Sequence, residues 1–241
     1  MQHSVGIDCL KPLRSLIMTS RQQLDVIIVA VYLISVAYVL YRAYQSISEY
    51  VEEQMTISFD KAGLESQLSD RQLKDVIDVN FGFGGRYSFD QPQEIAIMVV
   101  NKSKDKTLEI DWDRCSIQSD GRSRRVIRFP PDRRVDLSQR QVFSTIPPGG
   151  VIRERVSAED LLKLNANNVL EPKGPLVTIA ALPGPVKAAF LESKAELKFS
   201  MRVAVWIAED ISDDRPNNLQ MLNCEFAIKR VPLSEYLPWK R

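Results

Sequence analysis

Histidine is almost absent from this chain of 241 residues. The only one is His3, so every later residue lacks the side chain that most often acts as a general base or metal ligand near neutral pH. Cysteine is also scarce, and Cys9, Cys115 and Cys224 show no CxxC spacing. Catalysis by a serine, histidine and aspartate triad or by a cysteine and histidine pair is therefore disfavoured, as is a structural zinc site. We expect no enzyme activity, no cofactor and no metal.

An excess of charge of either sign is also missing. Lysine and arginine total 32 against 31 acids, so the chain lacks the general basic footprint of a nucleic-acid-binding protein, and we expect no nucleic-acid partner. The glycine-rich stretch FGFGGR, residues 81–86, has neither the GxGxxG spacing nor the GK pair of a phosphate-binding loop. We expect it to form a turn before a strand.

One long uncharged run lies near the N-terminus. Val26–Tyr41 reads VIIVAVYLISVAYVLY, sixteen residues without a charge, just short of the roughly 20 that cross a bilayer. Leu24 and the flanking tyrosines extend the run, and tyrosine is favoured at the membrane interface. We predict a transmembrane helix over residues 24–44. A buried soluble helix and a cleaved signal peptide are the alternatives; the long leader and the lack of a small-x-small site in LYRAYQSIS count against the peptide.

Charges on the two sides of this run predict its orientation. Three cations precede it, at Lys11, Arg14 and Arg21. After Arg42, four acids come before the next cation: Glu49, Glu52, Glu53 and Asp60. Because positive charge is retained on the cytoplasmic side, we expect residues 1–23 to be a cytoplasmic leader. The rest of the chain would then lie outside the cytoplasm, in a periplasm, a lumen or the extracellular space.

Residues 45–85 are expected to form a helical juxtamembrane stalk or a lead-in helix. Ser69 with Gln72 three residues later matches a capping box, which predicts that a helix begins at SDRQLKDVIDV. Four apolar residues would give this segment a face that docks on its own domain: Leu64, Leu68, Leu73 and Ile77.

Short β-rich runs dominate residues 86–232, and residues 233–241 form a C-terminal tail. Seven strands are predicted, at 94–101, 107–112, 124–129, 151–156, 175–181, 196–207 and 222–231. Glycine, proline, asparagine and aspartate separate them, which is typical of an antiparallel sandwich or barrel. Two short helices or loops are expected between strands, at 157–164 and 186–194.

The stretch TLEIDWDRCSI, residues 107–117, has acids that invite a catalytic interpretation. At period two, Leu108, Ile110 and Trp112 share one face of a strand. Their three acidic neighbours share the other face: Glu109, Asp111 and Asp113. We expect a solvated acidic face, in preference to a cation site or paired catalytic carboxylates, with Trp112 in the core. A bulge near Asp113 would bring Cys115 and Ile117 inward.

Three motifs of this region resemble an Ig-like sandwich of bacterial envelope proteins and lipoproteins. A strand ends in N-x-S at Asn101, the next carries I-x-W at Ile110, and a later turn reads IPPG from Ile146. The resemblance covers roughly residues 88–231. It implies a mainly β, antiparallel Ig-like sandwich and an envelope location, with no known site to transfer. Asn101 also begins a formal glycosylation signal, which has meaning only in a secretory pathway.

Arginine is concentrated between residues 114 and 134. Besides Arg114, six form a candidate site for anionic partners: Arg122, Arg124, Arg125, Arg128, Arg133 and Arg134. Arginine suits carboxylate and phosphate oxygens, so headgroups, a polyanion or an acidic protein could bind there. Arg124 and Arg128 would share a strand face opposite Arg125, so only part of the cluster can form one site. A solvated edge that discourages strand aggregation is the alternative.

Two classes of function remain. We expect a non-catalytic, single-pass accessory or scaffold subunit whose partners are the lipid bilayer and other subunits of a membrane or envelope complex. The alternative is an envelope enzyme or a protein that binds a small ligand or anionic headgroup. Cys115 and Cys224 are expected to pack as free thiols, although a disulfide between them is the alternative in an oxidising compartment.

Overall fold

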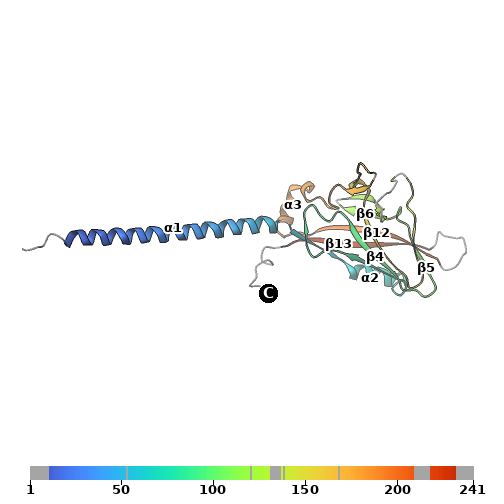
Figure 1. Cartoon of the computed structure of the whole chain (residues 1–241). Coiled ribbons are helices and arrows are strands. Elements are labelled where there is room, and N and C mark those ends of the chain that lie inside the picture. The colour runs from blue at the N-terminus through green and yellow to red at the C-terminus, as the bar shows by residue number, and fades with distance from the viewer. Residues whose placement is uncertain are drawn as a thin grey trace, which may run out of the picture. The chain divides into compact units, whose positions relative to one another are not determined.

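The structure is a computed structural model that describes residues 11–52, 54–119, 121–130, 137, 139–167, 169–208 and 218–231. In the N-terminal helix, side chains are described for residues 24–46. The chain divides into two compact units, Met1–Tyr50 and Val51–Arg241 (Figure 1).

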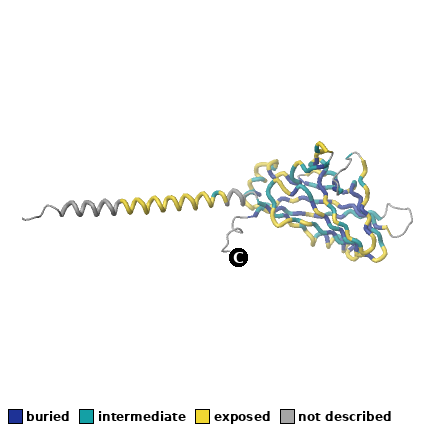
Figure 2. The backbone as a smooth tube through the Cα atoms, viewed as in Figure 1, coloured by how far each residue is buried: buried dark blue, intermediate teal, exposed yellow. Residues whose placement is uncertain are grey.

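The first unit contains one long helix, α1 (Lys11–Glu52). Its segment Leu24–Ser46 has 23 residues and a mean hydropathy of 2.3, and none of it is buried (Figure 2). By length and composition this apolar helix can cross a membrane, and a signal sequence near the N-terminus meets the same criteria. Inside it, the Ser35 hydroxyl donates to the Val31 carbonyl, which satisfies the polar group without a partner helix.

The second unit makes the protein mainly β, with 42% in strands. Eleven of its described strands form one antiparallel curled sheet, a half-barrel, and β10 (Leu162–Leu164) and β11 (Leu170–Pro172) form a separate two-stranded sheet. The strands are β1 (Gln54–Phe59), β2 (Ile77–Gly82), β3 (Tyr87–Ser88), β4 (Ile95–Asn101), β5 (Thr107–Ile110), β6 (Ser116–Ser119), β7 (Arg122–Arg128), β8 (Ser144–Ile146), β9 (Val151–Ala158), β12 (Leu197–Ala208) and β13 (Leu219–Arg230). The order is β2-β4-β9-β7-β6-β12-β13-β1-β3, with β5 between β12 and β8.

Strand β7 makes the sheet continuous. Its first half, Arg122–Arg125, pairs with β6, and its second half, Val126–Arg128, pairs with β9. A strand that changes its pairing partner in this way continues the hydrogen-bonded sheet through a bend. The expected Ig-like sandwich of two sheets is therefore not confirmed.

The core lies inside the curl (Figure 2). Strand β12 contributes every second residue to it, from Leu197 through Phe199 to Ile207. Phe226 of β13 contacts four other aromatic rings: Phe59, Phe81, Phe83 and Phe199. Such rings supply large buried apolar areas in edge-on and stacked contacts.

The expected helical segment at 45–85 is only partly correct, because β1 and β2 lie within it. Besides the end of α1, the segment contains helix α2 (Lys61–Asp70), which Asp60 caps by accepting from the Gly63 N–H. The prediction that Ser69 begins a helix is wrong: Gln72 has a φ of 57°, and the Leu73 N–H donates to the Leu68 carbonyl, so the helix ends there. Leu64, Leu68, Leu73 and Ile77 are buried, as predicted.

Helix α2 also covers an edge of β13. Strand β1 pairs with β13 up to Phe59, opposite Phe226. Beyond that point the Gln67 side-chain amide accepts from the Asn223 N–H and donates to the Asn223 carbonyl. Arg71 then donates to the Met221 carbonyl at 2.6 Å. Side chains of a helix thus continue the hydrogen bonding that a strand began.

Between β9 and β12 the chain forms short elements: η1 (Glu159–Leu161), the hairpin of β10 (Leu162–Leu164) and β11 (Leu170–Pro172), η2 (Ile179–Ala181) and α3 (Gly184–Leu191). Strand 175–181 is therefore wrongly predicted, since η2 occupies its end. The short helix expected over 186–194 corresponds to α3. FGFGGR ends β2 and leads through a turn into β3, as expected.

Candidate functional site

The acidic stretch after β5 is structural. Leu108, Ile110 and Trp112 have no exposed surface, as predicted. The expected solvated acidic face is wrong at Asp111, which is 7% exposed. Its carboxylate accepts from two backbone N–H groups in the following turn and forms an ion pair with Arg114 at 3.3 Å. The strand ends at Ile110, so a turn rather than a bulge redirects the chain.

Asp113 joins this turn to β7. Its carboxylate accepts from Arg125 at 2.5 Å and from the backbone N–H of Gln141 at 3.1 Å. Burial alone would raise the pKa of Asp113, but the hydrogen bonds from Arg125 and Gln141 outweigh it and hold the pKa below its ordinary value. The same pairing raises the pKa of Arg125.

Three arginines of the predicted cluster have partners inside the fold. Arg124 donates to the Ser119 hydroxyl and the Leu176 carbonyl, both at 2.6 Å, and its side chain is only 12% exposed. Arg128 forms an ion pair with Glu154 at 3.1 Å. Like Arg125, these side chains bind segments distant in sequence, so they are not a solvated edge. Arg124 and Arg125, predicted to lie on opposite faces of β7, bind different groups.

Arg122 differs from them because it is exposed. It lies between two hollows of about 400 and 270 Å³ and lines both. Arg133 and Arg134 lie outside the described residues. Of the four cluster members that the structure describes, Arg122 is therefore the one best placed to meet a ligand.

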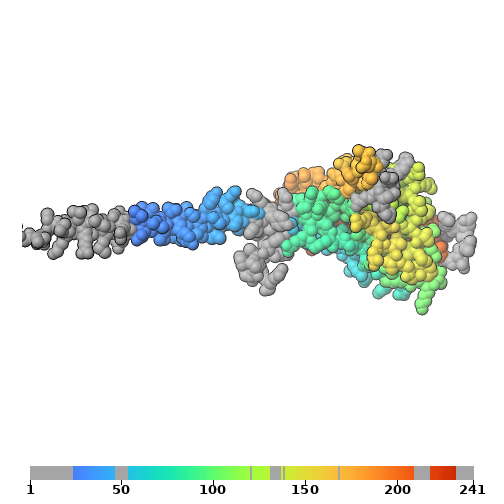
Figure 3. Space-filling view, viewed as in Figure 1, coloured from blue at the N-terminus to red at the C-terminus, as the bar shows by residue number. Residues whose placement is uncertain are grey.

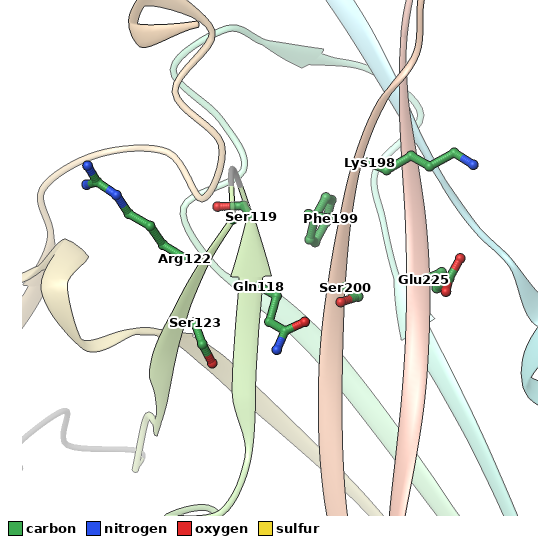
Figure 4. A pocket seen from close by; sticks show the side chains of 9 residues that line it. Gln118, Ser119, Arg122, Ser123, Lys198, Phe199, Ser200 and Glu225 are labelled. Carbon is green, nitrogen blue, oxygen red and sulfur yellow. The ribbon is translucent and has the colours of Figure 1, made fainter.

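The larger hollow has a polar floor that crosses four strands (Figure 4). Strand register places Ser123 beside Gln118, Gln118 beside Ser200 and Ser200 beside Glu225. Arg122 and Lys198 extend away from this row to opposite sides in Figure 4. Hydroxyl, amide and carboxylate groups suit a polar ligand. Sequence reasoning missed this row, although period-two alternation on β6 and β12 could have shown it.

The smaller hollow lies on the other side of Arg122. Ser119, Arg124, Asp160 and Thr178 contribute polar groups to its wall, and Leu176 and Leu182 make part of it apolar. Asp160 is 3.8 Å from Arg124, so the charge of this arginine is largely balanced within the wall.

The motifs that suggested an envelope protein meet in one hydrogen-bonded cluster around Asn101. Its side-chain nitrogen donates to the carbonyls of Lys106, Ile146 and Pro147 at 2.7–3.1 Å. Its oxygen accepts from the backbone and hydroxyl of Ser103. Asn101 is 1% exposed, so this buried amide fits a structural role and not a glycan acceptor.

Trp112 ties a neighbouring strand to the same turn region. Its indole N–H donates to the Ser144 hydroxyl at 2.9 Å. Strands β5 and β8 pair with Ile110 opposite Ser144. The N-x-S, I-x-W and IPPG motifs are therefore parts of one structural junction.

Cys115 and Cys224 are free and buried, which confirms the expected thiol packing. Burial raises the pKa of each thiol to about 12. The Cys115 thiol donates to the Asp111 carbonyl at 3.2 Å. Because both thiols are buried and their pKa values are raised, neither forms the reactive thiolate at neutral pH.

Among the described residues, no group of three or more histidine, cysteine, aspartate or glutamate side chains is arranged to hold a metal ion. The fold and site together define a mainly β unit with an N-terminal apolar helix and a polar surface hollow beside Arg122. Comparison with protein families, with characterised proteins and with solved structures gave no match.

Proposed function

We propose that this protein is a non-catalytic, single-pass, membrane-anchored accessory or scaffold subunit. In this proposal α1 is retained in the membrane, and the β unit contacts protein partners of a membrane or envelope complex outside the cytoplasm. The Ig-like relationship suggested by the N-x-S, I-x-W and IPPG motifs belongs to the same proposal.

The observation that carries the proposal is the exposed apolar helix Leu24–Ser46. At about 1.5 Å per residue its 23 residues measure about 35 Å, enough for about 30 Å of hydrocarbon. Only Asp25 and Arg42 are charged, and both lie near its ends. A helix so apolar and so exposed needs lipid or another protein around it.

Internal pairing in the β unit supports a role in binding rather than in chemistry. Arg124, Arg125 and Arg128 stabilise the fold through ion pairs, and Asn101 holds together its turns. Perturbed pKa values often mark catalytic sites, but here those of Asp113 and Arg125 arise from their ion pair and those of Cys115 and Cys224 from burial.

Membrane extraction and affinity purification test the anchor and the partners separately. We expect the full chain to resist alkaline carbonate, to retain its N-terminal residues by mass spectrometry, and to co-purify with stoichiometric subunits from detergent-solubilised membranes. Release by carbonate or loss of α1 would contradict the anchor. A lone monomer from native membranes would contradict the role as a subunit.

Impermeant thiol labelling tests the orientation. A cysteine at exposed Asp105 should be labelled in intact cells, whereas one at Gln22 should be labelled only after lysis. The reverse pattern would overturn the extracytoplasmic location.

Binding of an anionic ligand beside Arg122 is the second candidate, favoured by the exposure of Arg122 between the two hollows. The detergent-solubilised full chain should then bind a soluble polyanion more tightly than an Arg122→Glu variant does, with a difference that shrinks as salt rises. Equal binding at low salt would remove this candidate.

A further inference from the structure

A surface segment with a single charge precedes β12. Residues 175–191 read PLVTIAALPGPVKAAFL, and Lys187 is their one charge. With 26% of the whole chain charged, seventeen residues would carry about four charges. Burial does not explain the difference, because eight of these residues are exposed: Thr178, Ala180, Ala181, Pro183, Gly184, Pro185, Val186 and Ala188. We call these eight residues the α3 surface; orange atoms of α3 lie on the visible face in Figure 3.

Contacts inside the β unit fix the position of the α3 surface. Phe190 of α3 is buried, and its ring centroid lies 6.1 Å from that of Phe89. Phe89 follows β3, whose Ser88 pairs with Gln54, the first residue of β1. Helix α3 also contacts β13, which ends beside the start of β1 (Figure 1). The α3 surface therefore belongs to the end of the sheet at which β1 begins.

Chain length ties this end of the sheet to the apolar helix. The span ends at Ser46, α1 continues to Glu52, and β1 begins at Gln54. Six helical residues cover about 9 Å and two extended residues about 7 Å, so Gln54 lies within about 16 Å of Ser46 whatever the orientation of the two units. This distance is about the depth of a lipid headgroup layer and its adjacent water.

We propose that the α3 surface rests on the headgroup layer of the membrane that α1 crosses. The proposal depends on the anchoring of α1 proposed above, but not on which side of the membrane the β unit occupies. An uncharged surface loses little hydration on contact with lipid, whereas a surface of ordinary charge density would lose more. Lys187, half-buried at its edge, can extend its ammonium group toward lipid phosphate.

Fluorescence quenching by lipid tests the contact. The full chain with Cys9→Ser would carry an environment-sensitive dye at Val186→Cys or, as the matched control, at Val142→Cys; both valines are exposed, at 41% and 74%. Val142 lies near the opposite end of the sheet from α3. It precedes β8, and β8 pairs with β5, whose Ile110 pairs with Val205 of β12. Val205 is eight residues from Leu197, the end of β12 that lies near the start of β1, and eight strand residues measure about 26 Å. The two native thiols of the β unit are buried and should not label.

In reconstituted liposomes with headgroup-nitroxide lipid, we expect at least twofold stronger quenching at Val186 than at Val142. Equal quenching at both positions in protein that resists carbonate would overturn the lipid contact while leaving the anchor intact. Release of the protein by carbonate would instead overturn the anchor and this inference together. Quenching in liposomes that is absent in native membranes supplemented with the same nitroxide lipid would mean that a partner subunit covers the α3 surface there, which would also overturn it.

Discussion

Asn101 offers the sharpest test of how the β unit is held together. Its amide makes five hydrogen bonds, to Lys106, Ile146, Pro147 and Ser103, in a site 1% exposed. At about 1 kcal/mol net for each bond, and with some of the freed groups reaching water, Asn101→Ala should cost about 3 to 5 kcal/mol. Asn101→Asp keeps the shape but turns donors into acceptors that face three carbonyls, so its cost should be at least as large.

Urea unfolding of the detergent-solubilised full chain, followed by tryptophan fluorescence, measures the loss. Trp112 is a suitable reporter because it is buried and hydrogen-bonded to Ser144. With a slope of about 2 kcal/mol per molar urea, the midpoint should fall by about 1.5 to 2.5 M. The matched control is Asn80→Ala, which removes a single side-chain hydrogen bond, to Asp78, and should cost less than about 1 kcal/mol. Equal midpoints for the Asn101 and Asn80 variants would refute the reasoning.

Three further outcomes are expected. Arg122→Glu should change the free energy of unfolding by less than about 0.5 kcal/mol. Arg124→Ala should lower it by more than about 1 kcal/mol, because the Ser119 hydroxyl and the Leu176 carbonyl lose this donor. Equal urea midpoints for the two variants would contradict this difference. Since the folded pKa of Asp113 is below 3.8, its stabilisation is present above pH 3.8 and is lost as the pH falls through the folded pKa. Asp113→Asn should therefore have a lower urea midpoint than the wild type at pH 7, and the difference between the two midpoints should disappear in acid. A difference in midpoint that does not change with pH would contradict the ion pair. The two buried thiols should resist alkylation at pH 7 until the protein is denatured, and mass spectrometry that finds them protected in denaturant until reduction would instead reveal a disulfide.

Strands with unbroken alternation were predictable from the sequence. β12 and β13 were found within a few residues, because their apolar side chains recur at period two over seven or more residues. β4 and β9 were found as short β-rich runs between turn residues. β1 and β2 were missed because they flank α2, whose leucines at 64 and 68 have helical spacing that was extended too far along the chain. In the middle of β7 the pairing partner changes from β6 to β9, and the local sequence pattern does not indicate this change. The sequence therefore predicted a sandwich of two sheets where the structure has one curled sheet.

Facing directions in the candidate site were predictable, but the partners were not. Alternation predicts that Arg124 and Arg125 lie on opposite faces of β7, and the two side chains bind different groups, the Leu176 carbonyl and the Asp113 carboxylate. The group that accepts from Arg124, the Leu176 carbonyl, is 52 residues away in sequence. Contacts at such separations depend on the closure of the whole sheet, and alternation in one strand carries no information about them.

The glutamine of α2 has a consequence for self-association. If α1 anchors the protein in a membrane as proposed, copies of it meet at high local concentration, and an open strand edge can pair with a strand of another copy. Gln67 presents to Asn223 the same donor and acceptor that a peptide group would, so this part of β13 offers no template to another chain. Together with Arg71, which donates to the Met221 carbonyl, this glutamine occupies backbone groups of β13 that a further strand would otherwise pair with.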